Sequence, residues 1–299
     1  MQNKHLLKLL DLSREEIYEI LDLADQLKYD QKHGIPHEML KGKTLAMVFG
    51  KNSTRTRVSF EVGMFQLGGF ALFLSSSVSQ ISQGEPVQDT ARVLSRYCDG
   101  IIIRTNDQQE VEDLARYGDI PVINGLTDFS HPCQVLADLM TIRERKAKLD
   151  GLKVCYIGAG NNMANSIIVG GLKCGMSVSV ACPAGYEPAR QVLDFAASVT
   201  GAAFTLTNDP LEAAKDADVI FTDVWAAAGE EREKIFAPYQ VNDAVMAVAR
   251  PDCMVQHRLP AHRGEEITEA VFEAHAEEIF GEAENRLHAQ KAVMALLMK

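Results

Sequence analysis

Short apolar runs rich in β-branched residues alternate with segments of helical periodicity along most of the chain. Between the runs, apolar residues recur every three or four positions, which is typical of amphipathic helices. This alternation is the signature of parallel sheets that carry helices on both faces. We therefore predict strands at 43–49, 70–74, 99–103, 121–124, 152–158, 177–181, 203–206, 218–222 and 253–256.

The helices are predicted from periodicity and from local signals at their ends. Ser13-Arg14-Glu15-Glu16 has the pattern of a capping box, so an amphipathic helix is expected over 13–28. A longer helix is expected over 131–147, with a charged end that leads into Asp150-Gly151. The remaining helices are expected at 54–67, 87–97, 107–116, 162–174, 186–199 and 284–298.

The alternation restarts after the long helix at 131–147, which indicates two α/β domains in tandem. A length of 299 residues also suits two domains of roughly 150 residues each. We expect the first domain at 1–140 and the second at 141–283, each a mostly parallel sheet flanked by helices. The last helix, within 284–299, is expected to pack back on the first domain.

Charge and cysteine usage restrict the class of protein. The net charge of −11 argues against a general attraction to nucleic acid or to anionic membranes, since both need a basic surface. No apolar run approaches the roughly 20 residues that cross a bilayer. The six cysteines form no Cys-x-x-Cys pair and no zinc-like cluster, so we expect buried free thiols and no metal. Residues 1–11 do not have the pattern of a signal peptide, and a cytoplasmic location is expected.

The segment Phe49 to Arg57 lies between a predicted strand and a predicted helix, where open parallel sheets bind ligands. Ser53 and Thr54 are good N-cap residues, so backbone N–H groups and the positive end of the helix dipole face this position. The guanidinium of Arg55 makes an oxyanion or a phosphate the favoured ligand. On residue types alone, a capped helix with a solvated basic turn is an equal alternative.

Two further polar positions follow predicted strands. His131 and Gln134 flank Pro132 at a helix start and lie on one face, although a lone histidine there is more often a cap or a core residue. Arg104 directly follows three isoleucines. It either marks the exit of the strand into water or provides a third contact to phosphate.

These motifs together resemble the aspartate and ornithine carbamoyltransferase family over essentially the whole chain. The resemblance is carried by Ser53-Thr54-Arg55-Thr56-Arg57-x-Ser59-Phe60-Glu61 and by His131-Pro132-Cys133-Gln134. Within the family the chain is most similar to the ornithine enzymes. That similarity is carried by residues 84–95, by Ile103-Arg104-Thr105, by residues 124–128 and by residues 283–290.

The resemblance implies roles for individual residues in binding carbamoyl phosphate. Ser53, Thr54, Arg55, Thr56, Arg104 and Arg286 would hold the phosphate. Arg55, Thr56 and His131 would reach the carbonyl oxygen, and Gln134 would orient the carbamoyl nitrogen. Gln80 matches a position that family members insert into a neighbouring active site, which implies a homotrimer or a multiple of one. Arg258 and Leu259 fall in a segment that is also assigned to carbamoyl phosphate.

The expected reaction is carbamoyl transfer to the side-chain amine of ornithine, giving citrulline and phosphate. A neutral amine attacks the carbonyl carbon, charge builds on the carbonyl oxygen, and phosphate leaves. Preorganised donors at such an oxygen are typically worth on the order of 10²–10³ in rate each. The chemistry requires no metal and no organic cofactor. Arginine biosynthesis is the expected context.

The second domain is expected to bind the acceptor. Gly158-Ala159-Gly160-Asn161-Asn162 follows a strand and opens a helix, but it lacks the third glycine of a dinucleotide fingerprint and the acidic residue expected downstream. The resemblance instead implies that Asn162 and Asp223 contact the amino acid, with Asp223 taking the α-amino group.

Three positions of the expected acceptor pocket depart from the family pattern. The usual Ser-Met-Gly loop reads Ala227-Ala228-Gly229, and the usual His-Cys-Leu-Pro reads His257-Arg258-Leu259-Pro260. A buried guanidinium at 258 must find an anion or water, and it would repel an ammonium. Three alternatives therefore stay open: a different amine acceptor, a pocket that binds ornithine poorly, or a weakly catalytic paralogue that binds carbamoyl phosphate. Against these stands the possibility that Arg258 turns to solvent and nothing changes.

Overall fold

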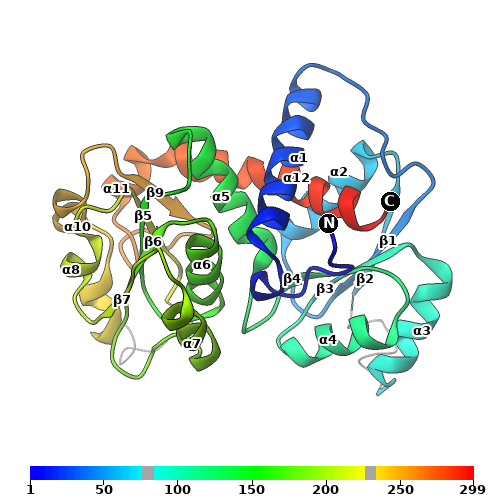
Figure 1. Cartoon of the computed structure of the whole chain (residues 1–299), viewed down its shortest axis with the longest axis horizontal. Coiled ribbons are helices and arrows are strands. Elements are labelled where there is room, and N and C mark those ends of the chain that lie inside the picture. Colours follow the sequence, from blue (N-terminus) through cyan, green and yellow to red (C-terminus); the bar gives the residue numbers. More distant parts are fainter. Residues whose placement is uncertain (76–83, 226–233) are drawn as a thin grey trace. The chain divides into compact units, whose positions relative to one another are not determined.

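The computed structural model describes residues 1–75, 84–225 and 234–299, and the chain divides into two compact units. Unit 1 comprises Met1–Met140 and Asn285–Lys299, and unit 2 comprises Thr141–Glu284. Each unit is a parallel sheet with helices on both faces (Figure 1). The C-terminal helix ends within unit 1, so the predicted fold class is confirmed.

The sheet of unit 1 has four parallel strands in the order β2-β1-β3-β4. Helices α1, α2 and α12 lie on one face, and α3 and α4 lie on the other (Figure 1). The bounds are Leu9–Asp11 (η1), Arg14–Lys32 (α1), Thr44–Phe49 (β1), Thr54–Gln66 (α2), Phe70–Ser75 (β2), Val87–Tyr97 (α3), Gly100–Arg104 (β3), Gln108–Tyr117 (α4), Val122–Leu126 (β4), Pro132–Lys146 (α5, ending in unit 2) and Ala276–Leu297 (α12, starting in unit 2).

The sheet of unit 2 has five parallel strands in the order β7-β6-β5-β8-β9. Helices α6 and α7 lie on one face, and α8, α10 and α11 lie on the other (Figure 1). The bounds are Lys153–Ile157 (β5), Asn162–Lys173 (α6), Ser177–Ala181 (β6), Arg190–Ser198 (α7), Phe204–Thr207 (β7), Pro210–Ala214 (α8), Val219–Thr222 (β8), Ala237–Tyr239 (η4), Asp243–Val248 (α10), Met254–His257 (β9) and Glu269–Ala274 (α11).

The central strands read as continuous apolar runs because helices cover both faces of each sheet. Ile101, Ile102 and Ile103 of β3 are all buried, with alternate side chains on opposite faces. Burying each such side chain contributes roughly 1.5–3 kcal/mol. The capping box of α1 is confirmed, since Ser13 Oγ accepts from the N–H of Glu16 at 3.1 Å and the Glu16 carboxylate accepts from the N–H of Ser13 at 3.0 Å.

Several helix boundaries differ from the prediction. Helix α1 continues to Lys32, and α12 begins at Ala276 rather than at 284. Helix α7 begins at Arg190 rather than at 186, because Pro188 cannot donate and disfavours helix in the residue before it. Helices α8, α10 and α11 have only five or six residues each, too few for a helical period to stand out.

Each sheet has a point where the strand order reverses. In unit 1 the chain leaves β1 for β2 on one side and then crosses to β3 on the other, so the reversal lies between β1 and β3. In unit 2 it lies between β5 and β8. Ligands of open α/β sheets bind outside the carboxyl ends of the strands at such a point.

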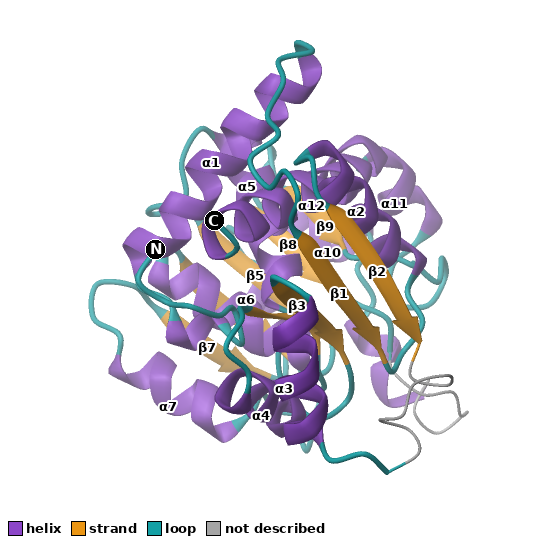
Figure 2. Cartoon of the chain, turned by 90° about the vertical axis from the view of Figure 1, so that its right-hand side faces the viewer, coloured by secondary structure: helices purple, strands orange, loops and turns teal. Residues whose placement is uncertain are grey.

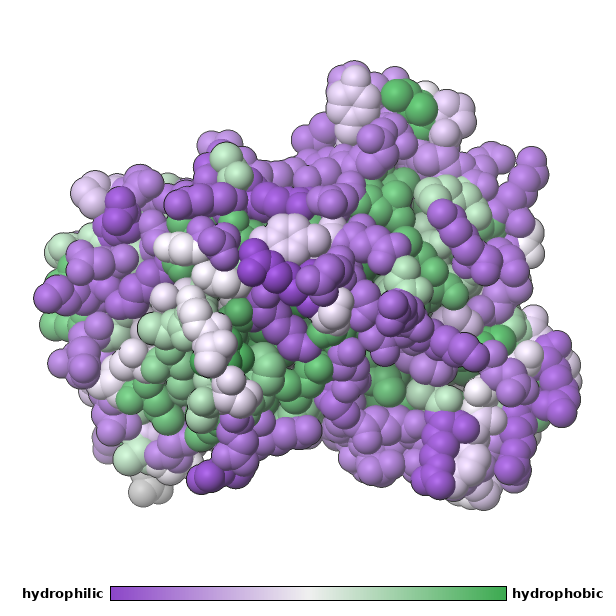
Figure 3. Space-filling model, viewed as in Figure 1, coloured by the Kyte–Doolittle hydropathy of each residue, from purple (hydrophilic) through white to green (hydrophobic). Residues whose placement is uncertain are grey.

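Hydrophilic side chains dominate the face of the molecule shown in Figure 3. Among the described residues, no helix combines the length and apolarity needed to cross a bilayer.

Strand β2 forms an edge of the sheet of unit 1 (Figure 2), and Phe70 and Leu72 along it are exposed.

Candidate active site

The N-terminus of α2 faces the reversal point of the sheet of unit 1. Ser53 is the N-cap of this helix, and its hydroxyl accepts from the N–H of Thr56 at 3.3 Å. The same hydroxyl donates to Thr56 Oγ1 at 3.0 Å. Thr56 is buried, whereas Thr54 and Arg55 are exposed. The segment therefore combines the N-terminal end of a helix, hydroxyls and a guanidinium within one turn, which suits an oxyanion.

Arg286 of α12 reaches this turn from the far end of the sequence. Its Nη2 donates to Thr56 Oγ1 at 2.9 Å, across a separation of 230 residues. The Arg286 side chain is buried. Ser53, Thr56 and Arg286 are thus joined in one hydrogen-bonded cluster, and the structure brings these three predicted residues together.

Arg104 lies at the end of β3, on the other side of the reversal point. It pairs in register with Phe49, the last residue of β1, and its carbonyl accepts from the N–H of Gly50 at 2.8 Å. A Cβ at Gly50 would lie 3.3 Å from that carbonyl oxygen, so the close approach of the two strand ends favours glycine here. The backbone of Arg104 is therefore adjacent to the start of the Ser53 segment.

His131 and Gln134 lie at the start of α5 and are both buried. Gln134 Nε2 donates to Asp138 Oδ1 at 2.9 Å, one turn further along the helix. Cys133 lies between His131 and Gln134 in the sequence. Burial raises the pKa of its thiol to about 12, while the positive charge of Arg286 acts in the opposite direction. Cys133 is a neutral packing residue at ordinary pH.

In unit 2, Asn161 and Asp223 lie on opposite sides of the reversal point between β5 and β8. Asn161 caps α6 by accepting from the N–H groups of Met163 and Ala164, and its Nδ2 donates to Asp223 Oδ2 at 3.2 Å. Asn162 is the first residue of α6 and is buried. Asp223 is 2% exposed. The two predicted acceptor contacts, Asn162 and Asp223, therefore flank one carboxyl edge of the sheet.

Arg258 follows β9 and binds Asp223. Its Nε donates to Asp223 Oδ1 at 2.7 Å, and the Arg258 side chain is only 20% exposed. The alternative that Arg258 turns to solvent is therefore wrong. Arg258 stays at this position because the buried carboxylate of Asp223 supplies the anion that a partly buried guanidinium requires.

Buried hydrogen bonds also hold the residues around Arg258. His257 Nδ1 accepts from the N–H of Leu259 at 2.9 Å, so Nε2 carries the proton and donates to Glu266 Oε1 at 2.9 Å. Leu259 has φ 58°, which is uncommon for a residue with a side chain and a form of strain that clusters at functional sites. This segment is consequently fixed in place beside Asp223.

Comparison with known proteins gives the decisive observation. Residues 4–144 match the model of the aspartate/ornithine carbamoyltransferase carbamoyl-P binding domain, and residues 150–297 match that of the Asp/Orn binding domain of the same family. The chain belongs to the aspartate/ornithine carbamoyltransferase family.

Similar members of the family are named as ornithine enzymes. The ornithine carbamoyltransferase of Carboxydothermus hydrogenoformans is 55% identical over 99% of this chain and 98% of its own length. A solved ornithine carbamoyltransferase from Pyrococcus furiosus superposes with a TM-score of 0.95 at 55% identity, covering 98% of this chain and 96% of that one. The structure from Gloeobacter violaceus gives 0.90 at 49% identity, covering 99% of both chains.

Gly160, after β5, has a packing role in this carbamoyltransferase chain. A Cβ at Gly160 would lie 2.2 Å from the carbonyl carbon of Glu187 and from the nitrogen of Pro188. The chain itself thus approaches Gly160 closely. In a dinucleotide-binding turn, the corresponding space is taken by pyrophosphate.

One group of side chains has the spacing of metal ligands within the described ranges. The ligand atoms of His262, Glu265 and Glu266 all lie within 4.8 Å of one another. Glu266 Oε1 already accepts from His257 and from the N–H of His262 at 2.7 Å. Because this buried carboxylate is committed to structural hydrogen bonds, we assign the group no metal role.

The family resemblance does not single out every residue around the site. Gln80, Ala227 and Ala228 lie outside the described residues. Asn161 was overlooked, although an asparagine directly after a strand-to-helix glycine is a recognisable N-cap signal. Asp138 was also overlooked, and its signal is the four-residue spacing from Gln134 on one helix face.

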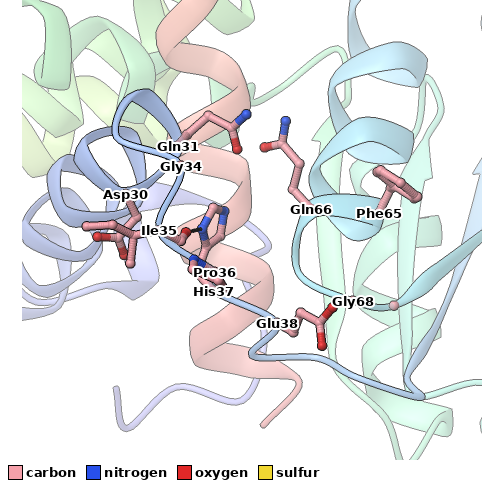
Figure 4. A pocket seen from close by; sticks show the side chains of 11 residues that line it. Asp30, Gln31, Gly34, Ile35, Pro36, His37, Glu38, Phe65, Gln66 and Gly68 are labelled. Atoms are coloured by element: carbon pink, nitrogen blue, oxygen red, sulfur yellow. Dashed lines mark hydrogen bonds between the residues drawn. The ribbon is translucent and has the colours of Figure 1, made fainter.

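A separate pocket of about 500 Å³ in unit 1 lies between the end of α1 and the end of α2 (Figure 4). Its lining includes His37, Glu38, Phe65 and Gln66. None of the site residues predicted from sequence lines it, so the pocket has no part in the candidate site.

Proposed function

We propose that this chain transfers the carbamoyl group of carbamoyl phosphate to the side-chain amine of ornithine, producing citrulline and phosphate. Membership of the family supports the reaction, and the printed names of its relatives support ornithine as the acceptor. The observation that carries the proposal is the hydrogen-bonded cluster of Ser53, Thr56 and Arg286 at the N-terminus of α2.

Phosphate is held at that helix N-terminus. Ser53 and Thr54 present hydroxyls and backbone N–H groups, and Arg55, Arg104 and Arg286 supply positive charge. Each charge-assisted hydrogen bond to a phosphate oxygen contributes roughly 1.5–3 kcal/mol. The local concentration of cations explains how a chain with a net charge of −11 retains an anionic substrate.

Catalysis then depends on donors at the carbonyl oxygen. Arg55, Thr56 and His131 stabilise the negative charge that builds on this oxygen, and Gln134 orients the carbamoyl nitrogen. The amine nitrogen forms a bond to the carbonyl carbon and loses a proton. The bond from that carbon to the phosphate oxygen breaks, and phosphate departs with the electron pair.

Unit 2 supplies the groups that recognise the amino acid. Asn162 and Asp223 contact its α-carbon substituents, and on the family resemblance alone Ala227 and Ala228 are assigned to the acceptor. Arg258 and Leu259 are assigned to the carbamoyl phosphate side, next to Asp223. The role of unit 2 in recognising the amino acid is supported by the position of Asp223, directly after β8 at the carboxyl edge of the sheet. The hydrogen bond from Arg258 to Asp223 shows that Arg258 lies at the same edge.

An assay with a panel of amines tests the proposal. The purified protein is incubated with carbamoyl phosphate and ornithine, lysine, putrescine or aspartate, and both phosphate and ureido product are quantified. Ornithine should give the highest rate, with equal amounts of the two products. Phosphate release without ureido product, or no release above the uncatalysed rate, would contradict the proposal.

A homotrimer, or a multiple of one, is proposed as the assembly. Val58, Val62 and Phe65 recur on one face of α2, and Phe70 and Leu72 project from the edge strand β2; all five are exposed, Phe65 to 80%. A second copy of the chain would cover this apolar patch. In such an assembly Gln80 would contribute to a neighbouring active site, as the family resemblance implies.

Light scattering tests the assembly. The wild-type chain should have three times the mass of the monomer or a multiple of it, and Phe65→Asp should lower that mass. Leu211→Asp, which makes the same kind of change at an exposed apolar position of unit 2, is the control. A wild-type monomer would contradict the proposed trimer.

A cytoplasmic role in arginine biosynthesis is proposed as the cellular setting. The support is the anabolic ornithine carbamoyltransferase of Pyrococcus furiosus, a relative that is 54% identical over the whole chain. Expression of the chain in bacteria that lack their own ornithine carbamoyltransferase should restore growth without arginine. Failure of a well-expressed and active chain to restore growth would contradict the biosynthetic role.

A further inference from the structure

Arg258 occupies an unusual electrostatic position for an acceptor site. It follows β9, whereas its partner Asp223 follows β8, and Asn161 follows β5. These are three adjacent strands of the sheet, so the three side chains meet at one carboxyl edge. A role for Arg258 in the choice of acceptor rests on the proposed carbamoyl transfer.

The carboxylate of Asp223 is already engaged within unit 2. Its Oδ1 accepts from Arg258 Nε at 2.7 Å and from the N–H of Val224 at 2.8 Å, and its Oδ2 accepts from Asn161 Nδ2 at 3.2 Å. A carboxylate offers about four acceptor positions, so these three donors use most of them. The guanidinium also neutralises the charge of the buried carboxylate.

The neighbouring residues keep this arrangement in place. Asn161 is fixed as the cap of α6, and the hydroxyl of buried Tyr156 donates to Asn161 Oδ1 at 3.2 Å. On the other side, the backbone beside Arg258 is fixed by the bond from the N–H of Leu259 to His257. The Asp223–Arg258 ion pair is therefore held in place by residues after β5 on one side and by the backbone after β9 on the other. Charges in such a poorly hydrated place interact strongly.

The charged groups of the acceptor determine how the Asp223–Arg258 ion pair affects its binding. Ornithine brings an α-ammonium, a carboxylate and a side-chain amine. An α-ammonium that approaches Asp223 must displace the guanidinium or remain beside a like charge. An ω-amino acid of the same length without the α-nitrogen, 5-aminopentanoate, has no such group, and its carboxylate is attracted by Arg258.

We propose that Arg258 is a specificity-determining residue that, through its ion pair with Asp223, weakens recognition of the α-ammonium and so admits ω-amino acids as carbamoyl acceptors. The transfer to 5-aminopentanoate forms a bond between its amine nitrogen and the carbonyl carbon. The amine loses a proton, phosphate leaves with the electron pair of the broken carbon–oxygen bond, and the product is 5-ureidopentanoate.

The test compares two acceptors across matched variants. The selectivity is the ratio of kcat/KM for ornithine to kcat/KM for 5-aminopentanoate at saturating carbamoyl phosphate. Arg258→Met removes the charge and keeps apolar length, Arg258→Gln removes the charge and keeps a donor for Asp223, and Arg258→Lys keeps a cation. Because both acceptors share one carbamoyl donor, any effect of these variants on carbamoyl phosphate cancels in the ratio.

Both neutral variants should raise the ratio roughly tenfold or more, mainly through a lower KM for ornithine, and Arg258→Lys should stay near the wild-type ratio. If Arg258→Met does not fold, the selectivity ratio of Arg258→Gln tests the inference. An unchanged ratio in a folded neutral variant that still turns over carbamoyl phosphate would overturn the inference and leave the proposed function intact.

A binding measurement separates this inference from the proposed function. If neither the wild type nor any variant forms a ureido product with either acceptor, carbamoyl transfer itself is refuted. Calorimetric titration of ornithine and of 5-aminopentanoate into the wild type and Arg258→Gln then gives the same ratio from dissociation constants. A ratio that rises in the variant supports the role of Arg258, and an equal ratio overturns it.

Discussion

Thr56 is the residue on which the phosphate cluster of unit 1 converges. Its Oγ1 accepts hydrogen bonds from Ser53 at 3.0 Å and from Arg286 at 2.9 Å, and the side chain is buried. Valine has the same shape without the hydroxyl, so Thr56→Val leaves both donors without this acceptor. A buried group that loses its partner costs about 1–3 kcal/mol.

We expect Thr56→Val to lower kcat/KM for carbamoyl phosphate by about tenfold to a hundredfold, because Arg286 loses the contact that orients it and the carbonyl oxygen loses a donor. Steady-state kinetics with carbamoyl phosphate as the varied substrate measures this. Thr205→Val makes the same chemical change at an exposed position of β7 and serves as the control. Equal kcat/KM in the two variants would argue against the cluster.

The cysteines make a second prediction for single residues. All six are buried and unpaired with one another, and burial raises the pKa of Cys133 and of Cys155 to about 12. Thiolates, not thiols, react with disulfide reagents. The native protein should therefore release little chromophore from an aromatic disulfide at about pH 8, and the protein in guanidinium should release six equivalents. Rapid reaction of one native thiol would show a reactive cysteine that burial does not suggest.

Among the secondary structure elements, the turn from β5 into α6 is very tightly packed. A Cβ at Gly160 would lie 2.2 Å from the backbone of Glu187 and Pro188, which cannot move aside as a flexible side chain would. We expect Gly160→Ala to lower the free energy of unfolding by about 1–3 kcal/mol, the usual cost of overpacking. Urea denaturation followed by circular dichroism measures it.

The control for this change is Gly281→Ala. Gly281 lies inside α12, and the nearest atom to an added Cβ is 4.0 Å away, on Arg145. Alanine favours a helix over glycine by roughly 1 kcal/mol, so this variant should be as stable as the wild type or more so. Destabilisation of equal size in both variants would contradict the packing argument for Gly160.

The strands and most helices could be predicted because their signals are local. Ser13 carries its capping partner three residues away, and Ile101–Ile103 read as a buried strand in isolation. The start of α12 was predicted too late because Gly281 lies inside the helix, and glycine disfavours helix interiors. The shortest helices were missed because five or six residues do not complete two turns.

For the molecule as a whole, the position of the site residues at the sheet edges could be predicted from the sequence, but the side-chain pairs that they form could not. Parallel topology sends Ser53 and Arg104 to one carboxyl edge and Asn161 and Asp223 to another, so the reversal points alone locate both groups. The bond between Thr56 and Arg286 spans 230 residues, and that between Asp223 and Arg258 spans 35. Such pairings follow from tertiary packing, which no local pattern reports.

Lys291 links the stability of the whole protein to pH. This α12 residue is fully buried in unit 1, and its Nζ donates to Gln66 Oε1 at 2.9 Å and lies 2.9 Å from His37 Nε2. His37 Nδ1 lies 2.8 Å from the carbonyl oxygen of Ile35, beside the pocket of Figure 4. That contact places the ring proton on Nδ1, which leaves Nε2 to accept from the lysine. Burial lowers the pKa of Lys291 from 10.5 to about 8.

The sign of the pH effect follows from this depressed pKa. Between about pH 8 and pH 10.5 the unfolded chain binds more protons at Lys291 than the folded chain does, so the contribution of Lys291 to stability rises with pH over that window. The rise is at most about 3 kcal/mol. We expect the free energy of unfolding of the wild type minus that of Lys291→Met to increase across these pH values, measured by urea denaturation at each pH. Lys41→Met, at an exposed position, should follow the wild type throughout, and a flat difference for Lys291→Met would contradict the burial of a titrating lysine.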